Sequence, residues 1–171
     1  MKKTMMILLA MALMVSVNAQ FTKARLQATG LTCAMCSNAI NKALLRVSFV
    51  ASVDPDIKNS AFNIVFRDGS AVDIDALKKA VQDAGFSIGA LELTGKFNKV
   101  NIANDEHVKL GACTFHFLDV KPDTLEGEAT LKVLDKDFVS SKEFKKLSSL
   151  TKMKCMQTGT MDGTRVYHVT I

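Results

Sequence analysis

One stretch decides how the first half of this chain is expected to fold: Gly30-Leu31-Thr32-Cys33-Ala34-Met35-Cys36-Ser37. Its two cysteines are three positions apart, so both sulfur atoms can reach one small ion. They come just after an alternating strand pattern and just before a helical pattern. The start of a helix lowers the pKa of a cysteine, because unpaired backbone N–H groups favour negative charge there. The stretch therefore predicts two thiolates presented on one loop.

Two thiolates form a sparse and soft set of ligands. A structural zinc site uses about four ligands in a tetrahedron, and no second pair of ligands lies near this loop in the sequence. Soft thiolates favour copper in its +1 state or a still softer ion. The loop therefore predicts a carrier of Cu(I), with Hg(II), Ag(I) and Zn(II) as the other candidate ions. Such an open site also lets an incoming thiolate take the ion.

The start of the chain shows the three parts of a secretory signal peptide. Lys2 and Lys3 supply the charged beginning, residues 5–17 form an apolar run, and residues 17–19 form a small-residue cleavage site. The apolar run is shorter than the about 20 residues that a membrane span needs, so a retained membrane anchor is the weaker alternative. We expect a mature chain that begins at Gln20, works in the periplasm or as a secreted protein, and has no stable membrane insertion.

The residues around the cysteine loop predict the element order β-α-β-β-α-β over about residues 21–93. Ala24 and Leu26 alternate with polar residues, as in a half-buried strand, and apolar residues recur at helical spacing after the loop. Asp73 is placed to cap the second helix, and Gly85 is placed to end it in the left-handed conformation. This order is the split βαβ arrangement, an antiparallel sheet with both helices on one face.

With these elements, residues 21–93 resemble the heavy-metal-associated (HMA) domain. That family includes copper chaperones, the amino-terminal domains of copper-transporting P-type ATPases and the periplasmic mercuric-ion-binding protein. Its signature is Gly-Met-Thr-Cys-x-x-Cys, which here carries Leu31 in place of methionine, and its closing Ala-Gly-aromatic stands here as residues 84–86. The resemblance implies a ferredoxin-like fold and Cys33 and Cys36 as metal ligands. It also implies a metal-transporting ATPase or another exported metal-binding protein as partner.

One residue departs from the family pattern: Pro55 lies in the expected second strand. Proline has no N–H to donate, so a central strand would not tolerate it. In this fold the second strand is expected at an edge of the sheet. A proline is tolerated at an edge and hinders edge-to-edge association with other chains.

The rest of the chain predicts a small β-rich domain whose function the sequence does not indicate. Strand patterns recur at about residues 100–102, 108–118, 129–133, 154–158 and 165–171. Residues 140–143 have the spacing of a helix capping box, and Asp162-Gly163 is a hairpin turn signal. Five strands with a helix between the third and fourth give the element order of an OB-like barrel.

These patterns divide the chain into three segments, joined in the mature part by a minimal hinge at Thr94-Gly95. We expect a signal peptide at residues 1–19, an HMA domain at residues 20–94 and the β-rich domain at residues 95–171. The expected fold class is α+β, a ferredoxin-like βαββαβ unit followed by the small barrel.

Two other roles for Cys33 and Cys36 stay open. An oxidising compartment favours a structural disulfide between them, and an empty metal site can itself oxidise. A C-x-x-C pair also marks thioredoxin-like oxidoreductases. Those proteins carry Trp-Cys-Gly-Pro-Cys, whereas this chain has no tryptophan and no proline near the motif.

No pattern of acid, base and nucleophile supports an enzyme, so a metal-binding protein or metallochaperone is the expected function. A thiol–disulfide oxidoreductase that uses Cys33 and Cys36 is the alternative. A third candidate is an interaction module, in which the first domain senses metal and the second binds another protein.

The other two cysteines, Cys113 and Cys155, have three competing explanations. Each lies in a predicted strand, and a secreted domain with two cysteines often joins them in a disulfide. They could instead be separate buried thiols, or form a second soft-metal site with Met153, Met156 and His116. The histidines are otherwise expected at the surface or hydrogen-bonded in the core: His107, His116 and His168.

The charge of the chain argues against one class of partner. The formal net charge is +5, and it falls to +3 once the leader with its two lysines is removed. Proteins that bind nucleic acid concentrate basic residues on a patch or stripe. Here the basic residues are spread along the sequence, so we expect no binding to nucleic acid.

Overall fold

The structure is a computed structural model that describes residues 19–31 and 34–171, so the expected signal peptide lies outside the described residues except for its last residue, Ala19. The helices are α2 (Ala34–Leu45), α3 (Ile74–Asp83), α4 (Ser141–Leu147) and the single turn α5 (Cys155–Thr158), beside the 3-10 turn η1 (Ile57–Asn59). The strands are β1 (Ala19–Thr29), β2 (Val50–Asp56), β3 (Ala61–Phe66), β4 (Ser87–Ile102), β5 (Glu106–Leu110), β6 (Cys113–Phe117), β7 (Asp123–Val133), β8 (Thr160–Met161) and β9 (Thr164–Thr170). Within these residues no helix is both long enough and apolar enough to cross a membrane.

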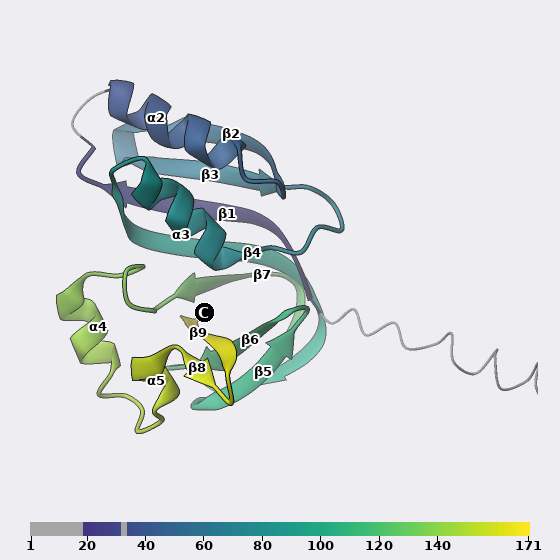
Figure 1. Cartoon of the computed structure of the whole chain (residues 1–171). Helices are drawn as coiled ribbons and strands as arrows, with labels where there is room; N and C mark the ends of the chain where they lie inside the picture. Colours follow the sequence, from purple (N-terminus) through teal and green to yellow (C-terminus); the bar gives the residue numbers. More distant parts are fainter. Residues whose placement is uncertain (1–18, 32–33) are drawn as a thin grey trace, which may run out of the picture.

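The first half has the predicted β-α-β-β-α-β order. Its strands pair antiparallel in the order β2-β3-β1-β4, and α2 and α3 cover the same face of the sheet (Figure 1). The expected α+β class with a ferredoxin-like first unit is therefore confirmed. β2 lies at the edge of the sheet, so Pro55 occupies an edge strand, as its missing N–H requires.

Both ends of α3 form as the sequence predicts. A side-chain oxygen of Asp73 accepts a hydrogen bond from the backbone N–H of Ala76 at 3.1 Å. Gly85 follows the helix with a φ of 89°, and the N–H of Phe86 reaches back to the carbonyl of Val81 at 3.1 Å. Glycine takes this left-handed conformation without the steric cost of a Cβ, so it ends the helix cleanly.

The closed OB-like barrel expected for the second half is wrong. β7 pairs antiparallel with β4, so the second half extends the sheet of the first half in the order β4-β7-β9-β6-β5, with β8 paired to β9. β2 and β5 remain the two open edges of one sheet. The alternation of apolar residues shows which face of a strand is buried, but it does not show which strand lies beside it.

Two strand predictions in the second half are also corrected. The strand expected over residues 108–118 is the hairpin β5–β6, which turns at Gly111 with a φ of 61°. Residues 154–158 contain the short helix α5 rather than a strand. The other local signals are confirmed, because the Ser140 hydroxyl caps α4 and Asp162-Gly163 turns the chain from β8 into β9.

The hinge expected at Thr94-Gly95 is not a break in the structure. β4 runs through it as one strand of 16 residues, paired with β1 on one side and β7 on the other. A Cβ atom on Gly95 would lie 2.9 Å from the carbonyl oxygen of Gln20 and 3.2 Å from the Cα of Phe21. Glycine is required here because β1 approaches β4 closely, not because the chain bends.

The two halves also share side-chain contacts. One hydrophobic cluster includes residues from both halves: Leu26, Leu77, Leu93, Phe115, Leu131 and Val169. On the surface of this cluster, Asp75 of α3 accepts hydrogen bonds from Arg165 at 2.9 Å and Tyr167 at 3.1 Å, both on β9. Burial alone would raise the pKa of Asp75, but hydrogen bonds from Arg165 and Lys78 outweigh it and keep the pKa below its ordinary value. The ionised carboxylate therefore links the halves.

We expect Gly95→Ala to lower the free energy of unfolding by about 1–3 kcal/mol, the usual cost of an extra methyl group in a packed site. The backbone of Gln20 and Phe21 must move to admit the methyl group. Equilibrium unfolding in urea measures the change. The control Lys96→Ala alters an exposed neighbour on β4, so it should change stability by less than about 0.5 kcal/mol. Equal stability of Gly95→Ala and the parent protein would contradict the close approach of β1 and β4.

Candidate metal centre

The loop with the predicted ligands joins β1 to α2. Gly30 begins it with a φ of 81°, a conformation that glycine adopts without strain. Leu31, which replaces the methionine of the family signature, packs against the hydrophobic core. Thr32 and Cys33 lie outside the described residues, so Cys36 is the predicted ligand that the structure places.

Cys36 is the third residue of α2 and is half-buried. The first turn of this helix contains no acidic residue, so the backbone N–H groups of the helix start set the local charge and favour an anion. Met35 beside it is 82% exposed, whereas Ile40 and Leu44 further along the helix are fully buried. α2 is therefore anchored by its middle and its end, whereas Met35 in its first turn faces solvent and Cys36 beside it is half-buried.

The first half of the chain thus defines a class of protein: a ferredoxin-like unit with a C-x-x-C loop at the start of its first helix. Residues 25–87 match the family model of the heavy-metal-associated domain. This part of the chain is a heavy-metal-associated domain.

Two kinds of curated relatives share this region. Copper-transporting ATPase RAN1 of Arabidopsis thaliana is 36% identical over 64 residues, which are 37% of this chain and 6% of the ATPase. The probable copper-transporting ATPase HMA5 of the same plant is 30% identical over 71 residues, 42% of this chain and 7% of that ATPase. Copper chaperone CopZ of Staphylococcus aureus is 29% identical over 63 residues, which are 37% of this chain and 91% of the chaperone. The chain therefore spans nearly all of the chaperone but only a small part of each ATPase.

Solved structures show the same partial similarity. The copper binding domain from HMA7, a P-type ATPase, is 30% identical and covers 42% of this chain and 92% of that domain, with a TM-score of 0.36. Oxidized MerP from Ralstonia metallidurans CH34 is 28% identical and covers 41% of this chain and 96% of MerP, with a TM-score of 0.34. Each alignment concerns less than half of this chain.

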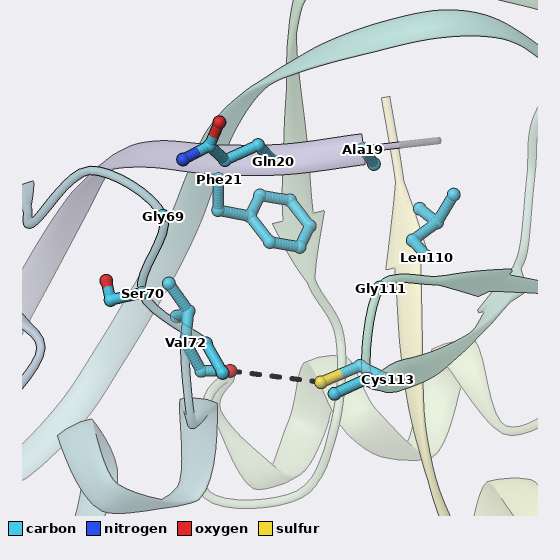
Figure 2. A pocket seen from close by; sticks show the side chains of 11 residues that line it. Ala19, Gln20, Phe21, Gly69, Ser70, Val72, Leu110, Gly111 and Cys113 are labelled. Carbon is cyan, nitrogen blue, oxygen red and sulfur yellow. Dashed lines mark hydrogen bonds between the residues drawn. The ribbon is translucent and has the colours of Figure 1, made fainter. Parts of the chain in front are cut away.

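Of the three explanations for Cys113 and Cys155, the structure does not form the disulfide, because both cysteines are free. Side chains alternate along β6, so Cys113 and His116 point to opposite faces of that strand. Cys113 Sγ lies 3.9 Å from the carbonyl oxygen of Val72 (Figure 2), whereas Cys155 Sγ lies 3.6 Å from His116 Nδ1. The strand therefore separates the two thiols, which sequence spacing alone could not reveal.

Cys113 borders a pocket of about 340 Å³ between the start of β1, the loop of residues 69–72 and the β5–β6 turn (Figure 2). Among the described residues that line this pocket, no other side chain is a thiol, an imidazole or a carboxylate. Burial raises the pKa of the Cys113 thiol, which makes it a weak nucleophile at neutral pH. Cys113 thus behaves as a separate, partly buried thiol.

The methionines predicted beside Cys155 have different surroundings. Met156 is buried in a small apolar cluster with Leu118 and Leu134, and Met153 is 38% exposed. Cys155 Sγ instead lies 3.4 Å from His107 Nε2, in addition to its contact with His116. Of the residues predicted for a second soft-metal site, the structure therefore brings together His116 and Cys155.

Sequence reasoning missed His107 as a neighbour of Cys155. Because a single strand was expected over residues 108–118, the β5–β6 turn was not recognised. Once the chain turns at Gly111, His107 stands directly opposite His116. The glycine at position 111 was the signal that could have placed it.

We expect denaturation without reductant to expose Cys113 and Cys155 as two reactive thiols in a Cys33→Ser/Cys36→Ser background. In the native state both should label slowly, because burial shields them and raises their pKa values. Mass spectrometry after thiol alkylation counts the labels. Adding Cys155→Ser should leave one label. If labels appear only after strong reductant, the disulfide exists and the observed strand geometry is wrong.

Proposed function

We propose that this protein is an exported carrier of a soft metal ion, Cu(I), held between Cys33 and Cys36. The observation that carries the proposal is the heavy-metal-associated domain at residues 25–87, whose Cys-x-x-Cys motif has Cys36 in the first turn of α2. Relatives of this domain are named as a copper chaperone and as copper-transporting ATPases, which supports copper as the ion. The leader pattern of residues 1–19 supports export to the periplasm or beyond.

Ligand exchange is the mechanism that this arrangement supports. Two thiolates hold the ion, and the start of α2 favours their negative charge. A thiolate from a partner binds the same ion to form a three-coordinate bridge, and one cysteine of the pair then leaves and takes up a proton. Copper stays in its +1 state throughout, and no electron moves.

The partner that fits this mechanism is a protein with thiolates of its own. A metal-transporting ATPase or another exported metal-binding protein would qualify, because exchange between thiolates never releases the ion to water. We propose binding and transfer rather than catalysis, since ligand exchange needs no acid, base or nucleophile beyond the two cysteines.

The reduced protein should bind one Cu(I) at the loop, far more tightly than it binds Zn(II) there. Cys33→Ser with Cys36→Ser should abolish this binding, measured against a Cu(I) chelator under anaerobic conditions. The apo double variant should melt within about 2 °C of the parent, because Cys→Ser exchanges one small side chain for another and is expected to cost within about 0.5 kcal/mol. The control Met35→Ala changes the exposed residue between the cysteines and should leave copper affinity unchanged. Stoichiometric, equally tight copper in the double variant would contradict the assignment.

The same cysteines should catalyse disulfide exchange poorly. The residue pair between them is Ala34-Met35, the chain has no tryptophan, and thioredoxin-like enzymes use a different loop. Assays of disulfide reduction and of oxidative refolding, run beside a known oxidoreductase, measure this activity. Comparable turnover that is lost in Cys36→Ser would favour the oxidoreductase over the metal carrier.

A further inference from the structure

The second half of the chain brings together three metal-ligating side chains that lie far apart in the sequence. His107 on β5, His116 on β6 and Cys155 at the start of α5 place their ligand atoms within 4.8 Å of one another. His116 is fully buried, Cys155 is 5% exposed and His107 is half-buried. In Figure 1 these elements lie at the bottom of the molecule, whereas α2 lies at the top. The cluster is therefore distinct from the cysteine loop.

The two sulfur–nitrogen distances in this cluster match one tetrahedral ion. Zinc bonds of about 2.3 Å to sulfur and about 2.1 Å to nitrogen, at a tetrahedral angle, separate the two ligand atoms by about 3.6 Å. Cys155 Sγ lies 3.4 Å from His107 Nε2 and 3.6 Å from His116 Nδ1. The two rings stack at an interplanar angle of 14° with their centroids 4.3 Å apart, so one ring must turn before the in-plane lone pairs of both nitrogens meet at one ion. Binding an ion therefore requires the rotation of one imidazole side chain.

A carboxylate orients one of the two imidazoles. Asp105 Oδ1 lies 2.9 Å from His116 Nε2 and accepts a hydrogen bond from it, which leaves the lone pair on Nδ1, the atom that faces Cys155. A carboxylate behind a histidine is the usual outer shell of a metal ligand.

A third histidine borders the cluster and has an unused nitrogen. His168 on β9 is in register with His116, and their ring centroids are 5.1 Å apart. His168 Nδ1 lies 2.6 Å from Asp135 Oδ1, so its proton is on that side. His168 Nε2 is buried and has no hydrogen-bond partner among the described residues. A buried polar atom without a partner is costly, and an imidazole lone pair of this kind is a metal ligand.

We propose that His107, His116 and Cys155 form a second metal site, which binds one Zn(II) ion. Two imidazoles and one thiolate are a ligand set of intermediate softness, which suits zinc better than the two-sulfur loop does. The three residues leave a fourth tetrahedral position open to another ligand, and His168 Nε2, which is not among the atoms that lie within 4.8 Å of one another, would have to move to reach it. The Cys155 thiol gives up its proton to solvent as the sulfur–zinc bond forms. This site does not depend on the function proposed for the loop.

The test uses the full-length reduced protein with Cys33→Ser and Cys36→Ser, so that the loop contributes no thiolate. Zinc titrated against a chelator should show one bound equivalent and raise the melting temperature, since an ion that binds only the folded state stabilises it. Adding Cys155→Ser or His116→Gln should weaken zinc binding more than about 100-fold. This loss exceeds the about 10–100-fold loss that follows when a residue behind a metal ligand is removed. The control Cys113→Ser removes the other thiol and should leave zinc affinity unchanged.

Two further variants keep the test decisive if a buried substitution prevents folding. His107→Gln alters a ligand that is only half-buried. Asp105→Asn introduces asparagine, which, like aspartate, tolerates the φ of 62° at this position. Asp105→Asn should weaken zinc binding about 10–100-fold through the orientation of His116, with the fold unchanged by circular dichroism. If only thiol–imidazole hydrogen bonds hold the cluster, the parent background binds no zinc, or binds it equally in every folded variant. Either outcome overturns the proposal and leaves copper binding by the loop untouched.

Discussion

The architecture of this protein depends on one strand, β4, which forms backbone hydrogen bonds with β1 on one side and β7 on the other. Its 16 residues exceed the about 3–10 residues of most strands, and the extra length carries it out of the ferredoxin-like unit into the second half. The last strand of one unit thereby becomes the first strand of the other. Because the two halves share this strand, they have no separate cores joined by a linker but bury one common hydrophobic cluster.

The two metal sites that we propose differ in exposure as well as in ligands. The loop site stands at the start of α2 beside the exposed Met35, where a partner's thiolate can reach the ion. The second cluster lies between β5, β6 and α5, with His116 fully buried and Cys155 nearly so. Transfer requires access to the ion, whereas retention requires that water and competing ligands be excluded. The loop pair, beside the exposed Met35, therefore suits an ion in transit, and the buried cluster suits an ion that stays.

The sequence predicted the first half well because its signals are local. The caps of α3, the edge strand with Pro55 and the β-α-β-β-α-β order each follow from residues that are neighbours along the chain. The second half was predicted less well because its arrangement depends on strand pairing. β7 of the second half pairs with β4, which begins in the first half, and an alternating pattern does not indicate such a distant pairing. Gly95 was interpreted as a hinge for the same reason, although a close approach of β1 requires it.

The sequence by itself determined that Cys33 and Cys36 stand three positions apart at the start of a helix, because spacing along the chain fixes which sulfurs can share an ion. Only the tertiary structure decided the fate of the other cysteines. The alternation of β6 puts Cys113 on one face of the sheet, and the β5–β6 turn with α5 brings His107, His116 and Cys155 together on the other. Ligands that meet through strand pairing have no characteristic spacing along the sequence. The number of residues between them depends on the fold and not on the ion that they bind.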